Sequence, residues 1–216
     1  GMKKQELFDT VLGTLAPKYG DVETELHFTT PFQLLVAVVL SAQCTDKRVN
    51  MITPALFEAY PDAAAMAQAT PEELLEYIKS VSYPNSKAKH LAGLAQMLVE
   101  TFNGEVPTTL EELTRLPGVG RKTANVVQAV AFHKAALAVD THVFRVSHRL
   151  GLVPKTANTP YKVEMALKKY IPEEKVAPSH FWLLLHGRYV CTALRPKCDK
   201  CDLRGLCKGP LQIKKR

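Results

Sequence analysis

The stretch Leu116-Pro117-Gly118-Val119-Gly120-Arg121-Lys122-Thr123-Ala124 decides the fold of this chain. A segment beginning at Thr109 precedes it and an apolar-faced segment, residues 126–131, follows it, which predicts two helices joined by a tight hairpin. We expect Pro117 to end the first helix and both glycines to adopt positive φ, so that backbone N–H groups point outward where the second helix begins. Such N–H groups, with the positive end of a helix dipole, bind phosphate without reading base sequence. An ordinary glycine-containing turn is the alternative.

Helical patterns extend over the rest of the chain, and only very short stretches alternate apolar with polar residues as a half-buried strand would. We therefore predict an all-α fold. Thr70-Pro71-Glu72-Glu73 predicts a capping box and a helix start, and Thr109 with Glu112 repeats the signal. The segment 32–40 is apolar nearly all round, which is typical of a helix at the centre of a bundle. Further helices are predicted over 160–170 and 181–190.

Composition limits the classes of partner. The chain has 216 residues, 46% of them hydrophobic, which suffices for a sizeable core. Its 28 Lys and Arg against 21 Asp and Glu give a net charge of +7, which favours an anionic partner, most often nucleic acid. The longest apolar run, residues 34–40, is far shorter than the roughly 20 residues of a membrane helix. We expect no membrane partner.

Four cysteines follow a C-x6-C-x2-C-x5-C pattern near the C-terminus: Cys191, Cys198, Cys201 and Cys207. Four thiolates on so short a segment suit an iron–sulfur cluster or a tetrahedral zinc. Zinc sites more often show two separate C-x2-C pairs, and here only one is present, so we favour the cluster while zinc remains open. A pair of disulfides is the non-metal alternative, which a reducing cytosol disfavours.

Two further residues are candidates for chemistry. Lys122 lies in the first turn of the second hairpin helix beside Arg121, where the helix dipole and the neighbouring cation favour a neutral, nucleophilic amine. Phosphate binding is the simpler interpretation of this lysine. Asp140 precedes an apolar helical stripe and is predicted to be its N-cap. A purely structural cap is one interpretation, but a carboxylate held at a helix N-terminus could also stabilise positive charge developing on a sugar.

The strings LPGVGRKTA and VDTHVFRV (residues 139–146) and the cysteine pattern occur in that order, and the chain resembles the endonuclease III family of helix-hairpin-helix DNA glycosylases. The resemblance runs from about Glu25 to Cys207. It includes Ser41-Ala42-Gln43, Asn85-Ser86-Lys87 and Leu185-His186-Gly187-Arg188. It implies two helical domains flanking a DNA-binding cleft. One is a six-helix domain, residues 23–134, with the helix-hairpin-helix at about 109–132; the other combines 1–22 with 135–216.

The resemblance also implies a cofactor and a reaction. A [4Fe-4S] cluster would be bound by the four cysteines, with the zinc alternative thereby set aside. Lys122 would be the nucleophile and Asp140 would stabilise positive charge on the sugar and assist proton transfer. A damaged nucleotide is flipped out of the duplex, Lys122 attacks C1′ and displaces the base, and β-elimination of the 3′ phosphate follows. The implied function is excision of oxidised pyrimidines in base excision repair, with N-glycosylase and abasic-site lyase activity at one site.

Further residues are expected to contact DNA. The hairpin residues Gly118, Val119, Gly120 and Arg121 would bind phosphate, and Arg195 and Lys197 would do so from the loop between the first two cysteines. The gap left by flipping would be filled by Gln43 from one side and an apolar residue from another. Many family members have a Gly-Leu-aromatic string before Asn-Ser-Lys, whereas this chain has Ser82-Tyr83-Pro84. We expect Tyr83 to act as the wedge, on a loop stiffened by Pro84.

The expected partner is double-stranded DNA with damaged bases or abasic sites, bound by a monomer in the cytoplasm, associated with the nucleoid in a prokaryote. Three alternatives remain. A catalytically silent DNA-binding module would use the same hairpin, and a small electron carrier would need neither hairpin nor lysine. Adenine-mismatch glycosylases of the same superfamily usually lack the lysine and add a C-terminal domain, whereas this sequence ends soon after Cys207.

Overall fold

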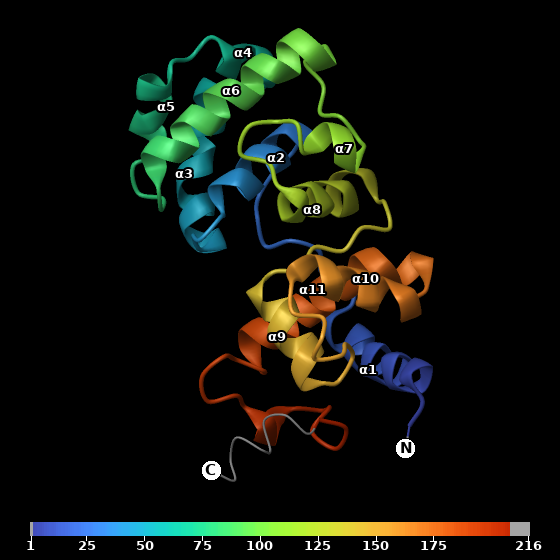
Figure 1. Ribbon diagram of the computed structural model, residues 1–216. Helices are drawn as coiled ribbons and strands as arrows, with labels where there is room; N and C mark the ends of the chain where they lie inside the picture. The colour runs from blue at the N-terminus through green and yellow to red at the C-terminus, as the bar shows by residue number, and fades with distance from the viewer. Residues whose placement is uncertain (1, 208–216) are drawn as a thin grey trace. The chain divides into compact units, whose positions relative to one another are not determined.

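The computed structural model describes residues 2–207. These residues form eleven α-helices and one short 3-10 helix and contain no strand, so the predicted all-α class is confirmed. No helix among them is long and apolar enough to cross a membrane. The chain divides into two compact units: Thr24–Lys134, and the N-terminal residues up to Glu23 together with the chain from Ala135 onward (Figure 1).

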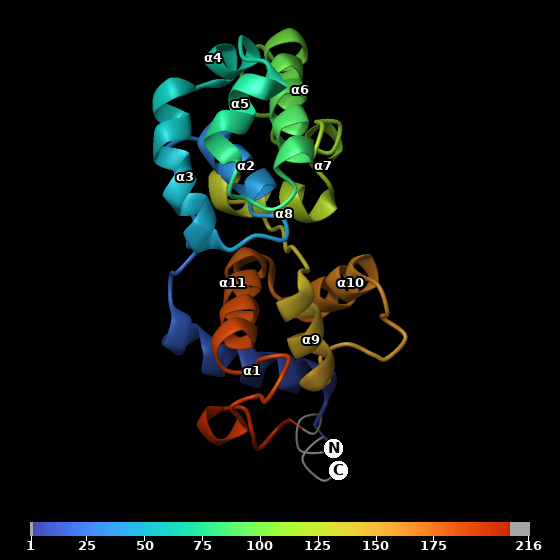
Figure 2. The same ribbon diagram turned by 90° about the vertical axis from the view of Figure 1, so that its left-hand side faces the viewer.

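The Thr24–Lys134 unit is built around one central helix, α2 (Pro31–Leu40), which packs against α3, α6 and α8 (Figures 1 and 2). All residues from Leu34 to Leu40 are buried, as the apolar run predicted. Pro31 begins the helix and the Thr30 hydroxyl accepts from the Gln33 N–H (3.2 Å). The other helices of the unit are α3 (Asp46–Ala59), α4 (Ala63–Ala67), α5 (Pro71–Ile78), α6 (Pro84–Phe102), α7 (Leu110–Leu113) and α8 (Arg121–Phe132).

This unit therefore contains seven helices, where the resemblance implied six. Two of the seven are very short, α4 with five residues and α7 with four, and each is started by a capping side chain, Asp62 or Thr109. The capping box at Thr70 is complete, as predicted. At Thr109 the hydroxyl accepts from the Glu112 N–H (3.2 Å) and donates to the Glu112 carboxylate (3.0 Å).

The second unit packs α1 (Lys4–Tyr19) against helices from the far end of the chain. These are α9 (Thr141–Arg149), α10 (Pro160–Tyr170) and α11 (Glu173–Tyr189), followed by the 3-10 helix η1 (Cys198–Lys200). Helix α1 contacts α10 and α11, and α9 contacts both as well. Phe8 on α1 stacks on Tyr170, with ring centroids 5.1 Å apart, and the Trp182 indole N–H donates to Gly20 O (2.9 Å). The first helix is thereby fixed to the last third of the chain.

Candidate functional site

The hairpin before α8 is stabilised by close packing against α6. Gly118 has φ +78°, and a Cβ on it would lie 2.8 Å from the Cβ of His90. A Cβ on Gly93 would likewise lie 3.1 Å from Pro117. Gly118 therefore adopts the positive φ that was predicted, and its close approach to His90 also leaves no room for a side chain. The buried Val119 anchors the turn between the two glycines.

Two details of the hairpin differ from the predictions. Gly120 does not adopt positive φ; its φ is −96° and it is the N-cap of α8. Helix α7 ends at Leu113, well before Pro117, so the proline does not end it. The Thr114 hydroxyl instead lies 2.9 Å from Leu110 O and 3.1 Å from Glu111 O, and its single proton can be donated to either of these carbonyls at the end of the helix.

The start of α8 presents open backbone N–H groups. No side chain caps this helix, and a Cβ on Gly120 would meet nothing within 4 Å. Lys122 is exposed in the first turn, next to the half-buried Arg121. An uncapped N-terminus with two adjacent cations is the arrangement expected of an anion-binding site.

A pocket of about 230 Å³ in the same unit brings three predicted DNA-binding residues together: Gln43, Tyr83 and Gly118. His90 and Lys87 also line it. Gln43 and Tyr83 both have positive φ, 53° and 51°, although neither is glycine. Tyr83 is 66% exposed, so its side chain is available to an external partner.

Asp140 belongs to the other unit and is the N-cap of α9, as predicted. Its carboxylate accepts from the Val143 N–H at 2.8 Å. The carboxylate is part-buried rather than fully enclosed, so capping does not remove it from solvent.

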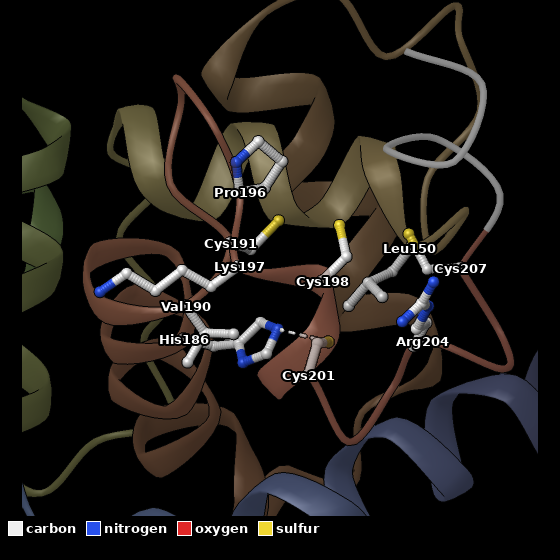
Figure 3. Close-up of a pocket in the computed structure, with 10 residues that line it drawn as sticks. All are labelled: Leu150, His186, Val190, Cys191, Pro196, Lys197, Cys198, Cys201, Arg204 and Cys207. Atoms are coloured by element: carbon white, nitrogen blue, oxygen red, sulfur yellow. Dashed lines mark hydrogen bonds between the residues drawn. The ribbon is translucent and has the colours of Figure 1, made fainter. Parts of the chain in front are cut away.

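The four cysteines of the C-terminal segment line one pocket (Figure 3). Cys191 follows α11, Cys198 and Cys201 lie at the two ends of η1, and Cys207 ends the described chain. Three of them are under 9% exposed. Within residues 2–207, no three His, Cys, Asp or Glu side chains converge closely enough for a single metal ion. A tetrahedral zinc at 2.3 Å from each sulfur would require sulfurs about 3.8 Å apart, whereas a cluster spreads its thiolates around a larger body.

The electrostatics of this pocket disfavour an uncompensated thiolate at Cys201. Burial is the largest cause raising the pKa of Cys201, and Cys191 and Cys198 raise it further, against a hydrogen bond from the Leu203 N–H that lowers it. Burial, aided by nearby Lys18, lowers the pKa of His186 to about 4. The His186 Nε2 lies 3.6 Å from the Cys201 sulfur. A cationic metal centre would act in the opposite direction and favour the thiolate form of Cys201.

Two arginines of α9 bind the loop that contains the first cysteine. Arg149 donates to Thr192 O (2.8 Å) and contacts the Cys191 sulfur (3.4 Å), and Arg145 donates to Cys191 O (3.0 Å) and Gly187 O (2.8 Å). Sequence reasoning missed this role, although the i, i+4 spacing of the two arginines places them on one helix face.

The loop between the first two cysteines presents both predicted phosphate-binding residues. Arg195 and Lys197 are exposed, and Arg195 has φ 51°. The Lys197 N–H donates to Val190 O (2.9 Å) and thereby closes the loop. The Thr192 hydroxyl lies 2.9 Å from Leu194 O and 3.3 Å from Arg195 O, so the loop is internally held.

The model of the HhH-GPD superfamily of base excision DNA repair proteins matches residues 36–173. Endonuclease III of Synechocystis sp. is 48% identical over 206 residues, 95% of this chain and 93% of that protein. The chain belongs to the endonuclease III family. The predicted resemblance is confirmed, and as a family member the protein is a DNA glycosylase and lyase of base excision repair.

Two further comparisons with endonuclease III proteins support the same family. Endonuclease III of Escherichia coli strain K12 is 46% identical over 184 residues, 85% of this chain and 86% of that protein. A solved structure described as a trapped endonuclease III–DNA covalent intermediate, an estranged-adenine complex, superposes with a TM-score of 0.93 at 43% identity, covering 99% of this chain and 100% of that one.

Proposed function

We propose that this endonuclease III family member excises oxidised pyrimidines from duplex DNA and cleaves the resulting abasic site, with Lys122 as nucleophile. The observation that carries the proposal is the exposed Lys122 in the first turn of an uncapped helix directly after the hairpin. The N–H groups there bind the DNA backbone while the amine remains accessible. The solved covalent endonuclease III–DNA complex supports a covalent route.

The reaction follows from the chemistry of these residues. After flipping, the Lys122 Nζ forms a bond to C1′, the bond from C1′ to the base breaks, and its electron pair leaves with the base. The Asp140 carboxylate stabilises the positive charge that develops on the sugar. The sugar ring opens to an imine, C2′ loses a proton, and the bond from C3′ to the phosphate oxygen breaks. Hydrolysis of the imine frees the amine.

Gln43 and Tyr83 are proposed to occupy the gap left by the flipped nucleotide. Their shared pocket and the exposure of Tyr83 support this role. An exposed aromatic ring can stack on bases of either strand, which is worth about 1–3 kcal/mol per base. Arg121, Arg195 and Lys197 are proposed to bind DNA phosphate. The partner we propose is duplex DNA with damaged bases or abasic sites, bound by a monomer at a bacterial nucleoid.

A [4Fe-4S] cluster is proposed as the cofactor, held by Cys191, Cys198, Cys201 and Cys207. The pocket that the four thiols share supports it. When bound, the cluster supplies four iron–thiolate bonds that cross-link the loop. The chain's own residues then act on DNA, because the loop so fixed presents Arg195 and Lys197.

Borohydride trapping tests the proposed function. The wild type should form a stable adduct on duplexes with an abasic site or thymine glycol, because hydride reduces the imine. Lys122→Gln should abolish trapping and strand cleavage and keep most lesion binding, since the backbone N–H groups remain. The exposed Lys89→Gln on α6 is a matched control and should trap normally.

Trapping by Lys122→Gln would move the nucleophile to another residue. A wild type that binds DNA but never traps would favour the silent module, and excision restricted to A·G mispairs would favour an adenine-specific glycosylase.

A further inference from the structure

The backbones of Gln43 and Tyr83 require external support. Left-handed φ is strained in a residue that is not glycine, and both residues adopt it at the edge of one pocket. Tyr83 also precedes Pro84, which narrows its backbone freedom. Because the Tyr83 side chain is mostly exposed, its own burial does not offset this strain. Neighbouring groups must fix the two backbones.

A hydrogen-bonded hub of Lys87 and Ser82 supplies that support. The buried Lys87 ammonium donates to Leu40 O (2.8 Å), Ala42 O (2.6 Å) and Ser82 Oγ (3.0 Å). An ammonium has three donors, so all three are used. Ser82 Oγ lies 2.8 Å from Gln43 O and 3.1 Å from Ala42 O; its single proton serves one of them at a time. The hub thus connects the end of α2 to the loop before α6.

The hub is an unusual way to stabilise a fold. Burial lowers the pKa of Lys87, although nearby Cys44 acts in the opposite direction, and Lys87 is only 5% exposed. Lysine is almost never this deeply buried unless its ammonium is paired. A buried cation with all donors used cannot reach DNA as a nucleophile, so its role lies in the geometry that it fixes.

We infer that Ser82 and Lys87 are positioning residues that hold Gln43 and Tyr83 as one rigid pair for opening the duplex. The inference rests on the proposed function, because it assigns the rigidity to the gap-filling step. Ser82 belongs to the Ser-Tyr-Pro string in which this chain departs from many family members. A glycine there would have no hydroxyl to bridge the two segments.

Single-turnover kinetics of Ser82→Ala test the inference. Loss of one hydrogen bond of about 0.5–1.5 kcal/mol should slow excision of thymine glycol from duplex roughly threefold to tenfold. Cleavage of a preformed abasic site should slow much less, because less stacking must be broken. Ser82→Thr keeps the hydroxyl and should restore excision. Ser80→Ala, an exposed serine in the same loop, should behave as wild type.

A double-mutant cycle separates positioning from general stability. If Ser82 acts through Gln43 and Tyr83, Ser82→Ala should add no further slowing in a background in which both Gln43→Ala and Tyr83→Ala are present. Fully additive effects, or equal slowing on both substrates, would overturn the inference. If a thermal unfolding curve shows that Lys87→Met is folded, this variant should show the same substrate dependence as Ser82→Ala. If Lys87→Met does not fold, the double-mutant cycle with Ser82 alone decides. Wild-type trapping on abasic DNA reports the proposed function independently.

Discussion

Two lysines of the Thr24–Lys134 unit differ sharply in what they can do. Lys122 is exposed in the first turn of α8, whereas Lys87 is buried and donates to three acceptors. A nucleophile must reach a sugar carbon, and only the exposed amine can do so without breaking the packing around it. The difference in burial separates the roles of the two lysines, whereas their residue type is the same and does not.

Asp140 allows its two proposed roles to be separated by one substitution. Asn is as good an N-cap as Asp, so Asp140→Asn should leave the bond from the Val143 N–H and change the free energy of unfolding by less than about 0.5 kcal/mol. The lost charge should slow base excision by about 10²-fold or more. Urea unfolding and single-turnover excision measure the two effects. Asp140→Ala should lose both the cap and the activity, and wild-type rates for Asp140→Asn would leave Asp140 as a cap only.

The residues that sequence reasoning placed correctly are those whose partners are local. Thr70 and Asp140 bond N–H groups three residues ahead, so adjacent residues suffice to predict them. Lys87 and Ser82 contact carbonyls about 40 residues away in sequence, and no local pattern specifies such a contact. The sequence also could not distinguish the conformations of the two hairpin glycines, because these depend on packing and only Gly118 faces His90.

At the scale of elements, the contact between α6 and the hairpin predicts a graded response to Ala substitution. Gly118→Ala would combine φ +78° with a Cβ 2.8 Å from His90. Gly104 has nearly the same φ, +79°, but a Cβ there meets nothing within 4 Å. We expect Gly104→Ala to lower the free energy of unfolding by about 1 kcal/mol and Gly118→Ala by about 2–3 kcal/mol.

Chemical denaturation of both variants measures the difference. Adding His90→Ala to Gly118→Ala should recover part of the extra loss, because it removes the clashing side chain. Equal losses at the two glycines would show that the hairpin and α6 are not in firm contact.

The segment that carries the four cysteines, residues 191–207, has no hydrophobic core of its own, so we expect its folded structure to depend on the bound metal. Cys198→Ser should lose one thiolate and with it iron, sulfide and the brown colour of an iron–sulfur protein. Cys44→Ser removes a thiol of the other unit, and this variant should keep the iron, the sulfide and the brown colour. Metal analysis of protein purified without oxygen measures this. Colourless wild type with stoichiometric zinc would contradict the cluster.

At the scale of the whole molecule, the net charge of +7 predicts binding that falls steeply with salt. If Arg121, Arg195 and Lys197 each neutralise one phosphate, each should contribute about −0.9 to the slope of log K against log salt concentration. Together the three account for roughly a 40-fold loss of DNA affinity between 50 and 200 mM salt. Replacing all three by Gln should reduce the slope by nearly 3 for undamaged duplex. An unchanged slope in the triple variant would place the phosphate contacts elsewhere.

The packing of α1 against α10 and α11 has a consequence for synthesis on the ribosome. The apolar side chains of α1 (Phe8, Val11, Leu12 and Leu15) emerge first, yet their partners on α11 begin only at Glu173. At 5–20 residues per second, this interval lasts roughly 10–30 s. The Thr24–Lys134 unit can fold during that time, while the first helix waits with its apolar face uncovered. A nascent chain stalled before α11 should therefore be a better substrate for a chaperone than one stalled after it.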